Sequence, residues 1–370
     1  MVQLCGDAHL LNFGFYASPE RSLLFDINDF DETHPGPFEW DLQRLAASLV
    51  LAARSQGLST KQQLKICRRG VRAYGKAIAR FADLPFIAMW RWRPDLDELI
   101  ESTPSHTLRH HLKAVVSRAR MRDSRQAVGK LCEPNGAGGL RFRHDPPLVW
   151  RFAELEERWH GGVPLEEWIR YSQTTYFASL RQEMRHFMGH FRLVDVALKA
   201  VGVGSVGTRC AIGLFVADDP DEVLVLQSKQ AESSVLARYI PDPEVPEHQG
   251  ERVVQGQRLM QTASDTFLGW ATNMEGQHCY RRHFRDWKGA VDLACLDAEA
   301  LGDYGKLCAI TLAKAHARSG DRRGLAAYLE VQAGFVDRMQ ELALLHADLA
   351  EQDHARLVVS MAAPGEHRST

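Results

Sequence analysis

The chain has 370 residues, 45% hydrophobic and 25% charged, and this composition excludes a wholly disordered protein. Its 45 Lys and Arg are balanced by 47 Asp and Glu, a formal net charge of −2, which excludes a global basic field for nucleic acid or an anionic membrane. No apolar run approaches the roughly 18 residues of a membrane-spanning helix, no signal-peptide pattern is present, and the seven Cys include no CxxC pair. We therefore expect a cytoplasmic protein with neither nucleic acid nor a membrane as partner.

The chain up to residue 191 is predicted to be mostly helical after a short region of strands. Apolar runs at 2–5 and 22–25 favour strands, and the sequence THPGP at 33–37 is typical of a turn. Apolar residues at three- and four-residue spacing predict helix over 39–79 and again over 165–190. Between these helices, residues 133–147 combine Gly, Pro and basic residues and predict a loop.

A β-rich segment over residues 192–288 then interrupts the helical pattern. Its predicted strands cover 193–201, 210–216, 223–229, 267–272 and 278–284, with one helix over 251–263. Helical spacing returns at residue 291 and continues to about residue 360. The pattern predicts an α+β protein in three segments, helical over 1–191, β-rich over 192–288 and helical over 289–370.

The first cluster of candidate functional residues combines GDAHLLN at 6–12 with the acidic run DINDFDE at 26–32. Phosphoryl transfer from a nucleotide needs a carboxylate to orient the acceptor hydroxyl, and carboxylate and amide oxygens to hold Mg²⁺. Asp7 and Asn12 stand five residues apart, the separation of base and metal ligand in the kinase catalytic loop. Asp29 precedes Phe30 after an apolar strand, as in the metal-binding DFG turn, and Asp26 is an alternative metal ligand.

The second cluster is a glycine run in which Gly202, Gly204 and Gly207 match GxGxxG, with Ser205 among them. The residues that follow lack helical spacing, which disfavours a dinucleotide-binding fold and favours a glycine loop between two strands. In kinases such a loop covers the nucleotide phosphates with its backbone N–H groups. A flexible hairpin is the alternative interpretation.

Two predicted strands follow the glycine run, and Lys229 ends the second of them. A kinase carries a Lys at this place to bind the α- and β-phosphates, held by a Glu from the following helix. Glu251 begins the next predicted helix and is preferred over Glu232 as the partner of Lys229. His316, near the end of a long helix, is interpreted as a structural residue that satisfies terminal carbonyl groups.

The motifs carry two resemblances. GDAHLLN resembles the HGDxHxxN motif of aminoglycoside and choline kinases, with Cys5 in place of the first His, and the later PFEWDL is similar to a segment that implies a structural role for Asp41. The whole chain resembles a bacterial family known as domain of unknown function 2252, through CGDAHLLNFG, FDINDFDETHPGPFEWDLQRLAAS, VGVGSVGTRC, LQSKQAESS, QRLMQTASDTFLGW and LAKAHARSGD. Members of that family usually carry residues before GDAH, which implies that this chain starts inside the family's full length.

The order of these parts predicts a circular permutation. In a kinase the glycine loop and the Lys precede the catalytic loop and the metal-binding Asp, whereas here they follow. Such a rearrangement is compatible with one fold wherever the chain ends lie close together. We therefore expect a two-lobed, protein-kinase-like fold with a small lobe at 192–288 and a helical large lobe built from both flanks.

The function expected from these residues is ATP- and magnesium-dependent phosphotransfer to an acceptor, a small molecule or a protein, that the sequence does not identify. Asp7 orients the acceptor, Asn12 and Asp29 bind Mg²⁺, and Lys229 binds ATP together with the glycine run. Two alternatives stay open. A metal-dependent phosphohydrolase is possible because Asp29 and Asp31 match a DxDxT motif, and the Cys5 substitution is compatible with a non-catalytic, pseudokinase-like nucleotide-binding protein.

Overall fold

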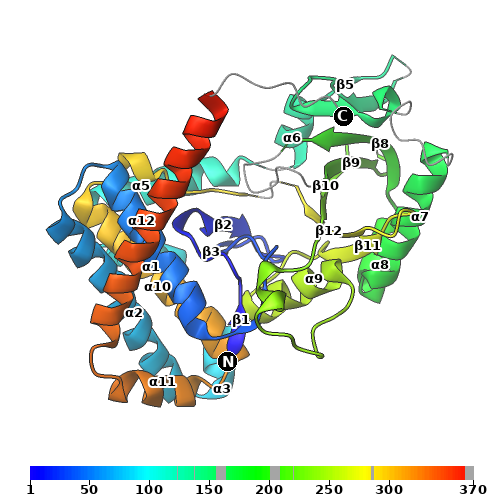
Figure 1. Cartoon of the computed structure of the whole chain (residues 1–370). Coiled ribbons are helices and arrows are strands. Elements are labelled where there is room, and N and C mark those ends of the chain that lie inside the picture. The colour runs from blue at the N-terminus through cyan, green and yellow to red at the C-terminus, as the bar shows by residue number, and fades with distance from the viewer. Residues whose placement is uncertain are drawn as a thin grey trace.

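The computed structural model describes residues 1–122, 124–136, 138–155, 164–200, 209–219, 221–284 and 287–362. Helices and antiparallel strands are both present, so the α+β class is confirmed. Most helices lie on one side of the molecule, the largest sheet lies on the other, and the β2–β3 hairpin lies between them (Figure 1). Within the described residues, no helix combines the length and the apolar character needed to cross a membrane.

The helical side is built around one buried helix, α10, which packs against α2, α1 and α5. The helices of the described residues are α1 (Phe38–Ser55), α2 (Thr60–Asp83), α3 (Phe86–Arg91), α4 (Leu96–Ser102), α5 (His106–Arg120), α6 (Ser124–Leu131), α7 (Leu165–Ser179), α8 (Gln182–Met188), α9 (Gln249–Met260), α10 (Ala298–Ser319), α11 (Arg322–Val331) and α12 (Phe335–Ala362). The main hydrophobic core includes side chains of both the β1–β4 region and the helical side. The loops within residues 1–36 therefore pack against the helices.

Three helix predictions were wrong at their boundaries, and the helix predicted over 165–190 is divided into α7 and α8. The helix predicted over 39–79 is two helices, because Gly57 adopts a left-handed φ of +70° after α1. Ser59 then starts α2, where its N–H donates to Gln62 Oε1 at 3.0 Å, as in a capping box. The helix predicted from residue 291 begins only at Ala298, because Asp297 caps it by accepting the Ala300 N–H at 2.8 Å.

Six antiparallel strands form the largest sheet of the described residues, in the order β11-β12-β10-β9-β8-β7. The strands are β1 (Val2–Leu4), β2 (Phe13–Ala17), β3 (Leu23–Ile27), β4 (His34–Gly36), β5 (Cys132–Pro134), β6 (Leu140–Phe142), β7 (Val149–Arg151), β8 (Arg192–Lys199), β9 (Cys210–Val216), β10 (Val223–Gln230), β11 (Gly269–Thr272) and β12 (His278–His283). The strands and helix predicted inside 192–288 are all present, and β7 joins their sheet from a position before residue 192.

Two segments predicted as turn or loop are paired strands. Residues 34–36 form β4, which pairs with β1, and the neighbouring Thr33 hydroxyl donates to Leu4 O at 2.5 Å. The predicted loop at 133–147 contains the β5–β6 hairpin, whose Phe142 packs in a core with the large sheet. These strands have three residues each, so they are too short to show alternation, and β4 depends on a partner distant in sequence.

Alternation along β10 gives the large sheet two different faces. Leu226 packs with residues of α7 and α8 on one face. Lys229 extends from the other face toward the loop that follows β3. The two faces therefore have separate chemical surroundings, although the same strands build both.

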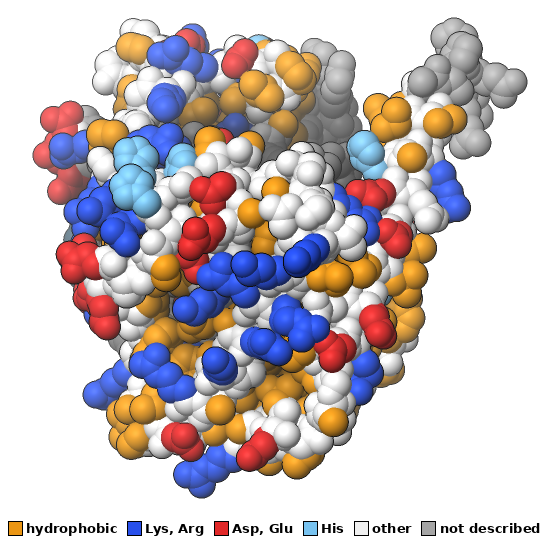
Figure 2. All heavy atoms as spheres, turned by 90° about the vertical axis from the view of Figure 1, so that its left-hand side faces the viewer, with side chains coloured by type: hydrophobic (Ala, Val, Ile, Leu, Met, Phe, Trp, Pro, Cys, Tyr) orange, Lys and Arg blue, Asp and Glu red, His pale blue; other side chains and the backbone are white. Residues whose placement is uncertain are grey.

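The outer face of the helical side carries an uneven charge distribution. Figure 2 shows a band of Lys and Arg side chains across this face, with few acidic side chains inside the band. Helix α2 alone exposes five basic side chains, Lys61, Lys65, Arg72, Lys76 and Arg80. The small net charge of the chain thus conceals local separation of charge.

Candidate functional site

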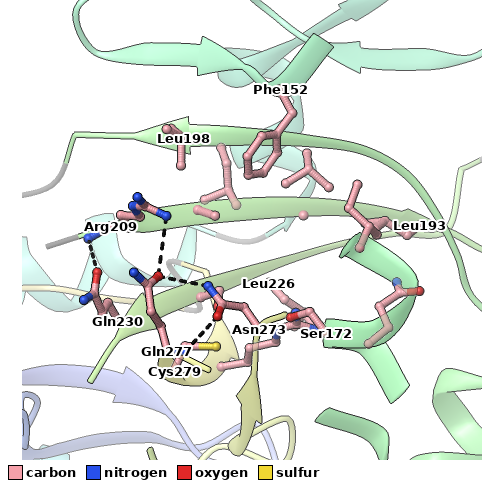
Figure 3. A pocket seen from close by; sticks show the side chains of 18 of the residues that line it. Phe152, Ser172, Leu193, Leu198, Arg209, Leu226, Gln230, Asn273, Gln277 and Cys279 are labelled. Carbon is pink, nitrogen blue, oxygen red and sulfur yellow. Dashed lines mark hydrogen bonds between the residues drawn. The ribbon is translucent and has the colours of Figure 1, made fainter. Parts of the chain in front are cut away.

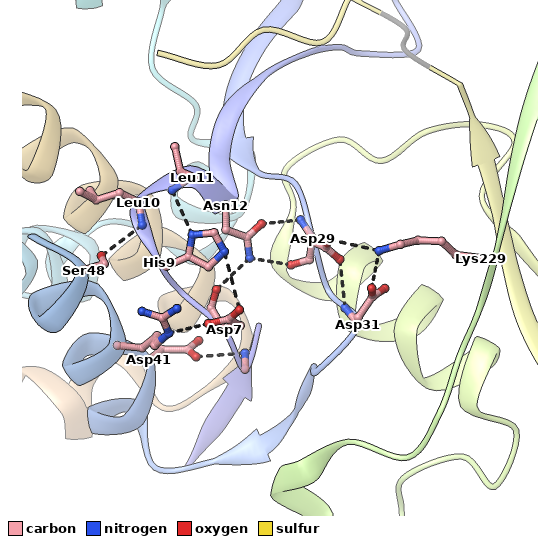
Figure 4. A network of polar contacts seen from close by, with 12 residues as sticks. Asp7, His9, Leu10, Leu11, Asn12, Asp29, Asp31, Asp41, Ser48 and Lys229 are labelled. Atoms are coloured by element: carbon pink, nitrogen blue, oxygen red, sulfur yellow. Dashed lines mark hydrogen bonds and ion pairs between the residues drawn. The ribbon is translucent and has the colours of Figure 1, made fainter. Parts of the chain in front are cut away.

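Two loops distant from β10 in sequence meet beside it, and Asn12 joins them (Figure 4). The Asn12 amide nitrogen donates to Asp7 O at 3.1 Å and to Asp29 O at 3.0 Å. Its amide oxygen accepts the Asp29 N–H at 2.6 Å. Because Asn12 is buried, these bonds fix the GDAH loop to the acidic run, while the Asp7 and Asp29 side chains keep 48% and 45% exposure.

The GDAH loop is held from inside the core by Asp41 and His316. The Asp41 carboxylate accepts the N–H groups of Cys5 at 2.8 Å and Gly6 at 3.0 Å. His316 Nε2 lies 3.3 Å from Asp41, and its Nδ1 lies 2.8 Å from the Tyr74 hydroxyl. Both residues thus have the structural role expected of them, but His316 acts through side chains rather than by capping helix carbonyls.

Asp7 is held by a cation that the sequence patterns did not indicate. Arg44 Nε donates to Asp7 Oδ1 at 2.6 Å, and His9 Nε2 lies 3.6 Å from the other carboxylate oxygen. Burial lowers the pKa of His9, although the charge of Asp7 opposes this effect. Arg44 stands three residues after Asp41 on α1, and this spacing, which puts both on one side of the helix, was the available signal.

Lys229 reaches the acidic run from β10. Its Nζ lies 3.3 Å from Asp29 Oδ2 and also bonds to the carboxylate of Asp31, and the lysine side chain is only 7% exposed. Tyr280, on the neighbouring strand β12, donates its hydroxyl to Asp31 Oδ1 at 2.6 Å. The four residues therefore form one connected polar network between the sheet and the β3 loop.

The two carboxylates of this network have opposite pKa shifts. Burial disfavours the charged form of Asp29, but the charges of Lys229, Arg282 and Lys288 outweigh it and lower the pKa of Asp29 to about 2. Burial and the nearby charge of Asp29 raise the pKa of Asp31. The pair thus combines a firmly ionised carboxylate with one that protonates more readily.

Arg282 and Lys288 add further positive charge beside Asp29. Arg282 Nη1 donates to Asn28 O at 2.9 Å, and both cations line a small cavity together with Asn28 and Gln261. Burial and the neighbouring charges of Arg282 and Lys229 lower the pKa of Lys288 to about 7. Strand alternation was the missed signal for Arg282, because it shares a face of β12 with Tyr280.

Comparison with known proteins identifies the family. A family model described as "Uncharacterized protein conserved in bacteria (DUF2252)" matches residues 1–360. The chain belongs to the DUF2252 family. No curated protein and no solved structure matches it, so the likeness to aminoglycoside and choline kinases rests on the motif residues alone.

Two site predictions for this DUF2252 chain were not met by the contacts. Asp26, the alternative metal ligand, forms an ion pair with Lys314 in which both side chains are at most 3% exposed, so its carboxylate does not reach the site. Glu251 accepts a hydrogen bond from Gln255 on its own helix at 2.9 Å. In the described part of the chain, the acidic partners of Lys229 are Asp29 and Asp31 instead.

The orientation of α9 explains the failure at Glu251. Successive residues of a helix point about 100° apart, so adjacent residues face different surroundings. In this helix Arg252 faces the acidic run, donating to Asp31 O at 2.8 Å and also to Thr33 O. The predicted glycine-run residues Gly202, Gly204, Ser205 and Gly207 lie outside the described residues, and the flanking strands β8 and β9 are sheet neighbours.

The oxygen donors of this DUF2252 site fit a magnesium ion only if nucleotide phosphates and water bind the same ion. In the ranges that the structure describes, no group of three or more His, Cys, Asp or Glu is arranged to hold a metal ion. Mg²⁺ bound with nucleotide phosphates usually needs only one or two protein carboxylates, because phosphates and water complete its shell. The half-exposed Asp29 carboxylate matches that requirement, and the buried Asn12 amide oxygen, which accepts the Asp29 N–H, lies beside it.

Proposed function

We propose that the protein is an ATP- and magnesium-dependent phosphotransferase of kinase-like type. One observation carries the proposal: Asp29 and Lys229, separated by 200 positions in sequence, lie 3.3 Å apart. Asn12 connects the same Asp29 to Asp7. The residue types that phosphoryl transfer requires, an acceptor-orienting carboxylate, oxygen donors for a metal and a phosphate-binding lysine, are therefore gathered in one network.

Asp7 is the residue proposed to orient the acceptor hydroxyl and to accept its proton. Its carboxylate is half-exposed, so an acceptor can approach it from solvent, and Arg44 holds it in position. Lys229 is proposed to bind the α- and β-phosphates, and its contacts with Asp29 and Asp31 keep its ammonium charged because they raise its pKa against the effect of burial.

Asp29 and Asn12 are the residues proposed to hold Mg²⁺, which would neutralise phosphate charge when bound. Arg282 and Lys288 lie on the same side of the network and can stabilise negative charge on the transferred phosphoryl group. This arrangement concentrates positive charge around one ionised carboxylate, which favours binding of a polyphosphate.

A permuted, two-lobed kinase-like fold is part of the proposal. The succession of the glycine run, Lys229, helix α9 and strands β11 and β12 follows the order expected of a kinase small lobe. The GDAH loop and Asp29 precede this unit in the chain and follow it in a kinase. The antiparallel sheet and the mostly helical remainder support this assignment of lobes.

The test of this function is nucleotide binding measured by titration calorimetry with ATP and Mg²⁺. We expect binding by the wild type and at least tenfold weaker binding by Asp29→Ala and Lys229→Ala. Lys306→Ala is the matched control, because Lys306 is exposed on α10 and outside the network. Equal, tight binding by the wild type and both site variants would refute the proposal. Asp7→Asn should retain binding but lose phosphoryl transfer.

A metal-dependent phosphohydrolase is the second candidate, favoured by the opposite pKa shifts of Asp29 and Asp31. In that reaction an ionised Asp29 attacks phosphorus and a protonated Asp31 donates a proton to the leaving group. Metal-dependent turnover of p-nitrophenyl phosphate without nucleotide, lost in Asp29→Asn, would favour this reaction. Nucleotide binding without any transfer would instead indicate a pseudokinase-like protein.

A further inference from the structure

A second cavity lies on the face of the large sheet that points away from Lys229. It lies between strands β8 to β10 and β12 and the helix α7, which contributes Ile169, Ser172 and Gln173 (Figure 3). The space between its lining atoms, counted out to open solvent, is about 740 Å³. None of its lining residues belongs to the network of Asp7, Asn12, Asp29 and Lys229 described above.

The cavity has an apolar end and a polar end. Figure 3 shows Phe152, Leu193 and Leu198 along one side, and the amides of Gln230, Asn273 and Gln277 on the other. Several of these amides bond to one another or to Arg209, so their positions are set before any ligand binds. A cavity with this division suits a molecule that has an apolar body and one polar head.

The charge of the lining favours an anionic head. Two arginines, Arg209 and Arg281, line the cavity, and no Asp or Glu is among the lining residues that the structure describes. Arg209 is neutralised at the rim by Glu275, whose carboxylate lies 3.0 Å away. Arg281 has no carboxylate within ion-pair distance in the described part of the chain.

The contacts that Arg281 makes with other described side chains are neutral. Its Nη2 donates to Ser172 Oγ at 2.6 Å, and its guanidinium carbon lies 4.9 Å from the centre of the Tyr176 ring. These neutral contacts position the guanidinium without cancelling its charge. Burial lowers the pKa of Arg281, as expected for a cation that lacks an acidic neighbour.

We propose that this cavity binds a small amphipathic carboxylate, with its carboxylate on Arg281 and its alkyl chain against Phe152 and Leu198. A carboxylate fits better than a phosphate, because one guanidinium fork matches a singly charged, planar head group, whereas a doubly charged phosphate calls for a second cation. This inference does not rest on the proposed phosphotransferase activity, because the two sites share no side chain.

The experiment is titration calorimetry of the full chain with four ligands that share one tail, octanoate, octyl phosphate, 1-octanol and octylammonium, all below micellar concentrations. We expect octanoate to bind at least tenfold more tightly than 1-octanol, and octylammonium not to bind. Arg281→Gln should weaken octanoate binding at least tenfold, whereas Arg281→Lys should retain part of it. Arg181→Gln is the matched control. It removes the same charge outside the cavity, from an exposed arginine that pairs with Glu183.

A second variant keeps the test decisive if Arg281→Gln does not fold. Leu198→Gln changes the apolar end and should weaken octanoate binding without affecting Arg281. Equal octanoate binding by the wild type and Arg281→Gln, or equal binding of octanoate and 1-octanol, would overturn the proposal. Tighter binding of octyl phosphate than of octanoate would overturn the assignment of a carboxylate head group, and the absence of octanoate binding by the wild type would reject the site.

Discussion

Replacing Lys229 by Met tests whether the charged network is formed as described. Met keeps most of the apolar length of the lysine side chain but removes the charge, leaving Asp29 and Asp31 without this cation. Breaking a fully buried ion pair costs about 3–5 kcal/mol, and breaking an exposed pair costs about 0.2–1 kcal/mol. Because Lys229 is 7% exposed but its partners are 45% and 33% exposed, we expect a loss of about 1–2 kcal/mol at pH 7.

The pH dependence of this loss follows from Asp29. Its pKa falls from 3.8 to about 2 in the folded protein, which corresponds to at most about 2.5 kcal/mol at about 1.36 kcal/mol per pKa unit. Solvent screening of this half-exposed carboxylate reduces the figure to about 1 kcal/mol. Since the folded pKa is depressed, the stabilisation is present above about pH 4 and is lost as the pH falls toward 2.

The assay is urea denaturation followed by tryptophan fluorescence at about pH 7, 4 and 3, so that the lowest pH lies between the unfolded and folded pKa values of Asp29. The wild type should be more stable than Lys229→Met at pH 7, and the difference should narrow as the pH falls. Lys306→Met is the control and should stay within about 0.5 kcal/mol of the wild type, because Lys306 is exposed. Equal stability of Lys229→Met and wild type at pH 7, or a difference that widens in acid, would refute the reasoning.

Further substitutions test two buried features of the fold, the close packing of Gly6 and the ion pair of Lys314 with Asp26. Gly6→Ala should destabilise the protein by about 3 kcal/mol, because φ is +87° and an added Cβ would lie 2.1 Å from Glu32 O. Gly57→Ala is the control in the same denaturation assay. It should cost only about 1 kcal/mol, because Gly57 has a similar φ of +70° but no neighbour within 4 Å of the added Cβ. Lys314→Met should lower the free energy of unfolding by about 3–5 kcal/mol, because it leaves the buried Asp26 carboxylate without its partner. The double variant Lys314→Met, Asp26→Leu should recover part of this stability. No recovery in the double variant would contradict the ion-pair explanation.

The parts of the fold that could be predicted are those with a strong local pattern. Strands β9 and β10 are apolar and bounded by polar turns, and they begin at the residues predicted. Strand β4 carries Pro and Gly, so its sequence is typical of a turn, and only its pairing with β1 makes it a strand. Tertiary contacts between distant segments overrode local preference in such places, and no window of a single sequence contains that information.

The candidate site shows the same division between local and distant information. Asp7, Asn12 and Asp29 were predicted because their spacing follows a known chemical pattern, and the structure joins them through hydrogen bonds. The partner of Lys229 was missed because the expectation of a Glu on the following helix does not specify how that helix is rotated. Arg282 was missed because its role depends on which face of β12 meets the acidic run.

The alternation of side chains along β12, which was overlooked for Arg282, also explains why the sheet can carry two sites. On β12, Tyr280 and Arg282 face the Asp29 network, and Arg281 between them faces the amphipathic cavity. On β10, Lys229 faces the network and both of its neighbours line the cavity. A ligand that binds Arg281 and shifts its backbone would therefore also shift Tyr280 and Arg282, the residues on either side of it. Loss of octanoate binding in Arg281→Gln with unchanged ATP binding would separate the sites, and a change in both would measure their coupling through these strands.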